Sequence, residues 1–227
     1  MDIQNGYFGK LPDRADFVIG RCPEGFLRHW EPFLMKGLAQ SRQDLGSAWE
    51  ETYMTMPVWR FWLVPEIEGG TMRDAVAGAL MPSVDKVGRK FPLTVASPAR
   101  TGDDNGRPEE AWYDRVETVL LDVLDEESSL QAFQQAVATL EDPSAVSADD
   151  PSLAYSTLAA APETDGKIQS FFWCRAGDQF FGFQCSGLPD AEAFRWLLLP
   201  EEHGEDTSES ETAGHTHGRY HPEDNRT

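Results

Sequence analysis

The stretch VWRFWLV (residues 58–64) limits the possible folds of this chain more than any other part of the sequence. Side chains of a β-strand point alternately to opposite faces, so Trp59 and Phe61 lie on one face and Arg60 and Trp62 on the other. Both faces are therefore largely apolar, which is typical of a strand that other layers cover on both sides.

A second stretch with two apolar faces, SFFWCRAGDQFFGFQCS (residues 170–186), predicts a β-hairpin that turns at its central Gly-Asp pair. This turn places Cys174 opposite Phe181 and Cys185 opposite Ser170, which separates the two sulfurs by more than disulfide reach. The chain has three cysteines and no CxxC spacing, so we expect reduced thiols. Together the two stretches predict a sheet covered on both faces, in a three-layer architecture.

Helical spacing of apolar residues marks the segment between these strands and the N-terminus. Residues 24–38 carry one apolar stripe, but Pro32 interrupts it, so we expect a short helical turn followed by a longer helix that starts near Glu31. A short helix around Trp49 and Tyr53 should follow.

Three more helices are predicted in the second half of the chain. Residues 108–124 have an acidic first turn and an apolar stripe, and Ser128 or Ser129 can cap a second helix with its own stripe. The last helix is expected to begin at Pro189 and to end at Pro200.

The formal net charge of -20 is unevenly distributed along the chain. Residues 1–100 carry 12 acidic and 12 basic side chains, whereas residues 101–151 carry 14 acidic and 2 basic ones. Such acidity repels polyanions, so we expect neither nucleic acid nor an anionic membrane surface as a partner. No apolar run approaches the roughly 18 to 20 residues of a membrane span, and the N-terminus lacks a secretory signal, so we expect a cytoplasmic protein.

The length and composition predict one domain over residues 1–200, with a polar linker or loop at residues 141–152. Residues 201–227 show no apolar period, and we interpret them as an acidic, histidine-containing, disordered tail. The histidines of its GHTHGRYH stretch could hold a transition metal loosely, but ordering such a tail costs conformational entropy. We therefore favour a solvated tail.

The common signatures of catalysis are absent from the sequence. No GxxxxGK[ST], GxGxxG, HExxH or GxSxG motif occurs, which argues weakly against an enzyme. His29 is the one histidine in the region expected to fold, and we interpret it as a partly exposed helix residue.

Charged side chains embedded in apolar sequence are more informative. An unpaired buried guanidinium is costly, so a carboxylate should meet Arg60, and Asp16 and Asp85 are the nearest candidates. Two interpretations stay open: an ion-pair network that fixes the loops around the sheet, or one surface for a partner or a small anion. The residues concerned are Lys10, Arg14, Asp16, Arg60, Asp85, Arg89 and Lys90.

Three blocks carry a resemblance to a known family. GYFGKLPDRADFV (residues 6–18), PVWRFWL (residues 57–63) and MPSVDKVGRKFPL (residues 81–93) resemble, in order and spacing, the signature blocks of the TagF family, also called ImpM. Proteins of that family are accessory proteins of bacterial type VI secretion. The resemblance implies an α/β fold, a three-layer α/β/α sandwich around a mixed, largely antiparallel central sheet.

The resemblance also implies a function. TagF-like proteins are cytoplasmic, non-enzymatic, post-translational negative regulators without cofactors, which restrain assembly or firing of the secretion apparatus. They act in connection with its forkhead-associated scaffold protein and with a threonine kinase and phosphatase pathway. The expected partner of this chain is therefore that scaffold.

We accordingly expect residues 81–93, with Lys10, Arg14, Asp16 and Arg60 around them, to form a structural ion-pair cluster that borders a partner-docking face. Two alternatives remain. One is a small phosphate-handling hydrolase that uses Asp16 or Asp85, with Arg60 and Arg89 as the anion clamp, and it would need a concave pocket. The other is a structural component of the apparatus.

Overall fold

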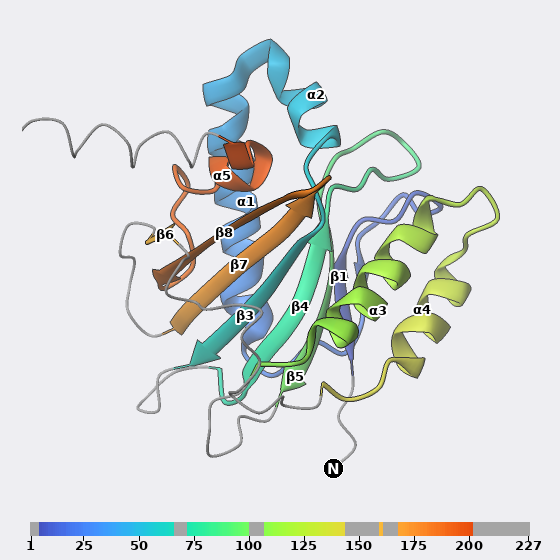
Figure 1. Ribbon diagram of the computed structural model, residues 1–227. Coiled ribbons are helices and arrows are strands. Elements are labelled where there is room, and N and C mark those ends of the chain that lie inside the picture. The colour runs from blue at the N-terminus through green and yellow to red at the C-terminus, as the bar shows by residue number, and fades with distance from the viewer. Residues whose placement is uncertain (1–4, 66–71, 100–106, 144–158, 161–167, 202–227) are drawn as a thin grey trace, which may run out of the picture.

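The protein is described here from a computed structural model, which covers residues 5–65, 72–99, 107–143, 159–160 and 168–201 (Figure 1). Most of the predicted linker and nearly all of the predicted tail lie outside these residues.

One eight-stranded sheet forms the centre of the molecule, in the order β2-β1-β5-β4-β3-β7-β8-β6. Every neighbouring pair is antiparallel except β6 and β8, which are parallel. The predicted mixed, largely antiparallel sheet is therefore confirmed. The strands are β1 (Gly6–Gly9), β2 (Val18–Ile19), β3 (Trp59–Pro65), β4 (Ala75–Met81), β5 (Leu93–Ala99), β6 (Ala159–Ala160), β7 (Ile168–Ala176) and β8 (Gln179–Ser186).

Helices cover both faces of this sheet, which confirms the three-layer sandwich (Figure 1). One face carries α1 (Phe26–Leu45), α2 (Trp49–Met54) and α5 (Arg195–Leu198). The opposite face carries α3 (Glu110–Leu121) and α4 (Leu130–Thr139). Two 3-10 turns, η1 (Gly46–Ala48) and η2 (Asp122–Leu124), follow α1 and α3.

The two-faced pattern of β3 explains this layering. Trp59 and Phe61 are buried in the core under α1, whereas Trp62 is buried in the core under α3. The indole of Trp59 also donates a hydrogen bond of 2.9 Å to the carbonyl of Leu197, which ties α5 to the sheet. One strand therefore contributes to two separate hydrophobic cores.

The β7–β8 hairpin has the predicted register. Cys174 lies opposite Phe181, and Cys185 lies opposite Ser170. The three cysteines are free thiols, as expected. Burial raises the pKa of Cys174 to about 12 and that of Cys185 to about 11, so both stay protonated at neutral pH.

Helix α1 differs from the prediction, because it runs without a break through Pro32. Proline removes the hydrogen bond to the carbonyl four residues earlier. However, Trp30 before it and Leu34 after it are both fully buried against the same core. Burial of this continuous apolar face outweighs the loss of one hydrogen bond, so the predicted second start near Glu31 is wrong.

Strand β4 lies in the middle of the sheet, between β5 and β3, yet it consists mostly of small residues. Ala77 and Ala79 are fully buried under α3. Gly78 lies between them, where an added Cβ would stand 2.2 Å from the carbonyl oxygen of Val95 and 2.3 Å from the ring of Phe61. Small side chains here let the large aromatic residues of the two cores approach the sheet closely.

Candidate functional site

A buried carboxylate organises the loop between β4 and β5 (residues 82–92). The Asp85 side chain is 0% exposed, and its Oδ2 accepts hydrogen bonds of 2.7 Å from Lys10 Nζ and from Arg89 Nε. Its Oδ1 accepts from the backbone N–H groups of Val87, at 3.0 Å, and of Arg89, at 2.8 Å. We call Lys10, Asp85 and Arg89 the Asp85 cluster.

Backbone bonds hold this loop in place. The amide of Asp85 donates to the carbonyl of Arg89 at 2.9 Å, and Gly88 has a φ of 89°, a left-handed conformation that glycine adopts without strain. The hydroxyl of Tyr53 on α2 donates to the carbonyl of Ser83 and accepts from its amide, each at 2.9 Å. The loop is therefore fixed against α2 as well as closed on itself.

The same loop also bonds to the segment that follows β1. The hydroxyl of Ser83 donates to the carbonyl of Lys10 at 2.8 Å, and the amide of Lys86 donates to the carbonyl of Arg14 at 2.9 Å. The guanidinium of Arg89 donates to the carbonyl of Ala15. Residues 10–15 and residues 82–92 thus form one rigid unit.

Two opposing effects act on the Asp85 carboxyl. Burial alone would raise its pKa, but hydrogen bonds from Lys10, from Arg89 and from the amide of Val87 hold the pKa well below its usual range. Asp85 is therefore a carboxylate at neutral pH with both oxygens engaged, which suits a structural role better than that of a general base.

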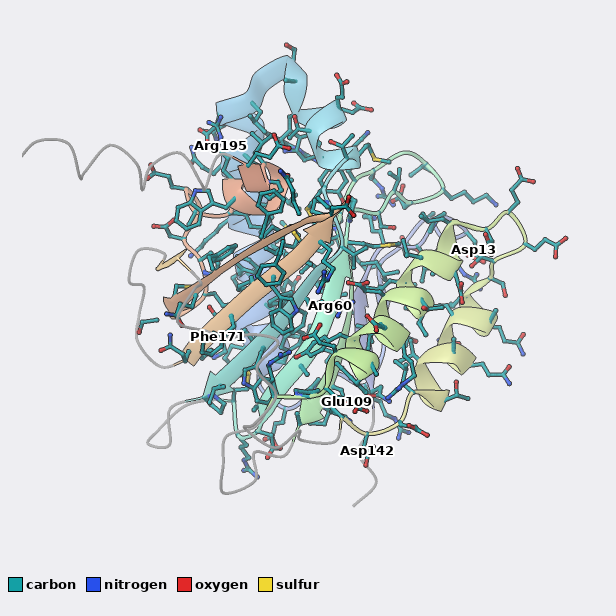
Figure 2. All side chains as sticks on the ribbon, viewed as in Figure 1. Asp13, Arg60, Glu109, Asp142, Phe171 and Arg195 are labelled. Atoms are coloured by element: carbon teal, nitrogen blue, oxygen red, sulfur yellow. The ribbon has the colours of Figure 1, made fainter. Side chains whose placement is uncertain are left out.

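Arg60 belongs to a different cluster. It points from β3 toward α3, where Nε donates to Glu117 at 2.7 Å, Nη1 to Glu110 at 2.5 Å and Nη2 to Asp114 at 2.6 Å. Figure 2 shows Arg60 between the sheet and α3. We call Arg60 and these three carboxylates the Arg60 cluster.

The prediction that Asp16 or Asp85 would meet Arg60 is therefore wrong. Burial disfavours the charged guanidinium, but the carboxylates of the Arg60 cluster outweigh this effect and hold the pKa of Arg60 above its usual value. Carboxylates four and three residues apart on one helix face suffice to surround the cation. That spacing of Glu110, Asp114 and Glu117 was the sequence signal that could have identified them.

The other two predicted site residues, Arg14 and Asp16, are exposed at the surface. Arg14 is about half exposed and pairs with Asp13 at 3.2 Å. Asp16 is exposed and makes no ion pair with any residue that the structure describes. The structure therefore brings together Lys10, Asp85 and Arg89 with the backbone of Arg14, and it places Arg60 in a different cluster.

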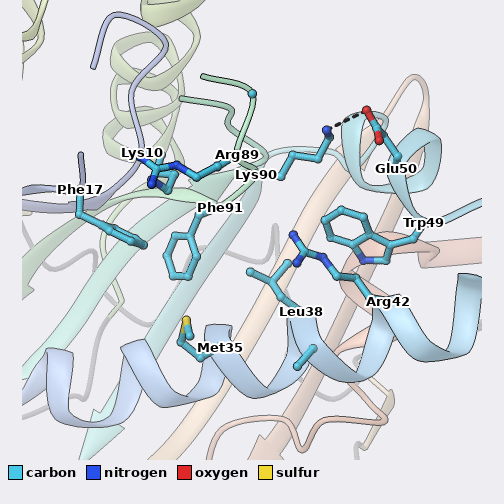
Figure 3. A pocket seen from close by; sticks show the side chains of 12 residues that line it. Lys10, Phe17, Met35, Leu38, Arg42, Trp49, Glu50, Arg89, Lys90 and Phe91 are labelled. Carbon is cyan, nitrogen blue, oxygen red and sulfur yellow. Dashed lines mark ion pairs between the residues drawn. The ribbon is translucent and has the colours of Figure 1, made fainter. Parts of the chain in front are cut away.

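A groove of about 540 Å³ lies beside the Asp85 cluster, between α1, α2 and the 82–92 loop (Figure 3). We call it the basic groove. Its cations are Lys10, Arg42, Arg89 and Lys90, and its one carboxylate is Glu50, which pairs with Lys90 at 2.7 Å. Its apolar residues include Phe17, Met35, Leu38, Trp49 and Phe91.

Sequence reasoning missed the residues that α1 and α2 contribute to this groove. Met35, Leu38, Ala39 and Arg42 follow one another at steps of three, one and three, which places them on one face of α1. Leu38 belongs to the buried stripe, and the exposed residues Met35, Ala39 and Arg42 follow its edge, which is the signal that could have identified them. The guanidinium of Arg42 lies 4.2 Å from the ring centre of Trp49, a cation–π contact.

The carboxylates in and around the basic groove are mostly engaged. Asp85 is saturated, Glu50 is paired with Lys90, and Asp16 does not line the basic groove. Among the described residues, no group of three or more His, Cys, Asp or Glu side chains is placed to hold a metal ion. None of the described helices is both long and apolar enough to cross a membrane.

Comparisons with known proteins agree with this architecture. The model of the TagF N-terminal domain, described as type VI secretion system-associated, matches residues 6–140. The crystal structure of PA0076 from Pseudomonas aeruginosa PAO1 has 31% sequence identity and a TM-score of 0.69, and the match covers 97% of this chain and 100% of that one. No curated protein matches. The chain therefore belongs to the TagF family of type VI secretion system-associated proteins.

Proposed function

We propose that this chain is a cytoplasmic, non-enzymatic regulator that restrains type VI secretion after translation, by binding the forkhead-associated scaffold protein of the apparatus. Binding would withhold the scaffold from assembly or firing. A threonine kinase and phosphatase pathway would then act on the same step through separate proteins. Membership in the TagF family supports the link to type VI secretion.

The saturation of Asp85 carries this proposal. A carboxylate that accepts four hydrogen bonds, two of them from cations, has no free lone pair for abstracting a proton or attacking a substrate. The bonds fix the loop that forms one wall of the basic groove. The charged residues of the N-terminal half thus support a surface, which favours binding over turnover.

The ion pairs of Arg60 and Arg89 also argue against the hydrolase alternative. It requires Arg60 and Arg89 to clamp one anion, but Arg60 is enclosed by carboxylates of α3 and Arg89 is bound to Asp85. No observation favours a structural component of the apparatus over a regulator.

Two methionines provide a matched test of the docking face. Met35 is 54% exposed and lines the basic groove, whereas Met54 is 49% exposed and does not line it. Met35→Glu should weaken binding of the purified scaffold, measured by isothermal titration calorimetry, by about tenfold, because it places a charge in the contact area. Met54→Glu should leave the affinity unchanged, and both variants should retain the melting temperature within a few degrees.

Equal scaffold affinity for both folded variants would remove the basic groove from the interface. Absence of any scaffold binding by the wild-type chain would refute the proposed partner. Stoichiometric co-purification with the assembled apparatus, without scaffold binding, would instead support the structural-component alternative.

A further inference from the structure

We propose that the basic groove binds an acidic segment of a partner protein that carries a large apolar side chain. This inference rests on the proposed function and adds the chemistry of the partner. It comes from three features of the groove, which are its charge, the fixed positions of its cations and its exposed apolar wall.

The charged side chains that line the groove are mainly positive, whereas the whole chain is strongly negative. The protein has a formal net charge of -20, yet the four cations that line this groove meet only two carboxylates of the described residues, Glu50 in the lining and Asp85 bonded to Lys10 and Arg89. Most acidic side chains therefore lie elsewhere, and the groove is a local basic site on an acidic molecule. Opposite charges across an interface guide encounter and exclude partners of the wrong sign, so this groove selects an anionic segment.

The cations are held in place before any partner arrives. Asp85 anchors Lys10 and Arg89, each at 2.7 Å. Arg42 lies over the ring of Trp49 and makes no ion pair with any residue that the structure describes. Lys10 and Arg89 are thus already paired and shape the groove, whereas binding a carboxylate at Arg42 loses little side-chain entropy, because its side chain is already ordered against Trp49.

Arg42 is the cation best placed to meet a partner carboxylate. Its guanidinium is exposed, and the contact with Trp49 leaves its N–H groups free of a bond to a described carboxylate. A guanidinium presents its donors in a planar fork that fits a carboxylate.

The second requirement, an apolar side chain on the bound segment, follows from two exposed apolar residues that line the groove. Phe17 is 44% exposed and Met35 is 54% exposed. The ring of Phe17 packs edge-on against Phe91 at 4.9 Å, so it is fixed while one side of it faces the groove. Covering these two side chains releases water only if the bound segment itself carries apolar surface.

This requirement separates a partner from residues 201–211, the acidic stretch that follows α5. The sequence EEHGEDTSESE (residues 201–211) has six carboxylates and no large apolar side chain. It matches the charge of the groove but offers nothing to cover Phe17 and Met35. A partner segment with both properties satisfies both requirements, and we therefore assign the groove to such a segment.

Peptide probes test this assignment on the full chain by fluorescence anisotropy. The first probe is a short labelled peptide of glutamates with a central phenylalanine, the second has serine in place of phenylalanine, and the third has lysines in place of glutamates. The fourth is the peptide of residues 201–211. The first probe should bind most tightly, should lose about fivefold with serine, and should lose all measurable binding with lysine.

Two arginines of α1 provide the matched variants. Arg42→Gln should weaken binding of the first probe by about fivefold, because a preorganised cation is lost from the groove. Arg28→Gln removes the same charge from the same helix outside the groove and should leave the affinity unchanged. Melting temperatures of the two variants show whether each is folded.

Three results would overturn the inference. Equal binding of the first probe and the 201–211 peptide would assign the groove to the chain's own acidic stretch. Displacement of the first probe by millimolar inorganic phosphate, with no loss on replacing its phenylalanine, would indicate a small-anion site. Equal effects of Arg42→Gln and Arg28→Gln would place the peptide elsewhere.

The inference and the proposed function fail separately. If the scaffold binds the chain but none of the acidic probes does, the partner is confirmed and the assigned chemistry is wrong. If the first probe binds as expected but the purified scaffold does not, the groove has the assigned chemistry and the named partner is wrong.

Discussion

The Arg60 cluster and the Asp85 cluster both neutralise a buried charge by ion pairing, but the buried charge is positive in the first and negative in the second. In the Arg60 cluster a buried strand cation is enclosed by carboxylates of one helix, and this joins the sheet to α3. In the Asp85 cluster a buried carboxylate is enclosed by two cations and two backbone amides, and this shapes a loop. The first cluster therefore holds α3 against the sheet, and the second fixes the 82–92 loop that lines the basic groove.

The two clusters also differ in how much water their members can reach. Asp114 is 66% exposed and its neighbours Glu110 and Glu117 are 28% and 26% exposed, whereas Asp85 is 0% and Lys10 is 6% exposed. If Arg60 is replaced, water can hydrate the carboxylates that it leaves unpaired. If Asp85 is replaced, water cannot reach the ammonium group of Lys10. The Asp85 cluster should therefore be the more sensitive of the two.

The largest effect is expected for Asp85→Ala. This change leaves Lys10 buried without its counter-charge and leaves the amides of Val87 and Arg89 without acceptors. The midpoint of urea unfolding should fall further than for any change in the Arg60 cluster. A smaller shift than that caused by Arg60→Met would contradict the ranking of the two clusters.

Arg60→Met should destabilise the protein by about 2 to 3 kcal/mol. A broken buried pair usually costs more, but the carboxylates left behind are partly solvated, and methionine retains the apolar packing. The matched control is Arg115→Met on α3, where the partners Glu109 and Glu141 stand 3.9 and 3.8 Å away at the surface. Arg115→Met should lower the free energy of unfolding by at most about 0.5 kcal/mol in the same denaturant titration. If both variants lose the same free energy of unfolding, burial does not determine how much an ion pair contributes.

Much of the fold could be predicted because its determinants are local. The alternation in residues 58–64 and the hairpin of residues 170–186 led to the two-sided sheet and to the register of Cys174 and Cys185. Strands β4 and β5 were not predicted, since alanine and glycine have weak strand preference and β4 shows no alternation of polarity. Their place in the sheet depends on packing against aromatic residues distant in sequence.

The Asp85 cluster was predicted partly from residues close in sequence and partly from the family resemblance, which brought in Lys10, 75 residues from Asp85. Asp85 and Arg89 are four residues apart, and both were recognised as members of one cluster. The partners of Arg60 lie 50 to 57 residues away, so the spacing of the carboxylates on α3 points to Arg60 only once the fold places α3 over β3. Arg42 and Trp49 were missed because the spacing of residues 35–42 on α1 points to a groove only once α1 and α2 pack beside the 82–92 loop.

The carboxyl titration of Asp85 tests the central claim, that this residue is an ionised structural hub, most directly. Because its folded pKa lies below the unfolded value, Asp85 stabilises the fold above about pH 4, and this stability is lost as the pH falls through the folded pKa. The difference in unfolding free energy between the wild type and Asp85→Asn should therefore stay constant from pH 7 to about pH 5 and shrink below about pH 4. NMR of the wild-type carboxyl group should show Asp85 still ionised below about pH 3.9. A carboxyl group that titrates at or above that value would contradict the account.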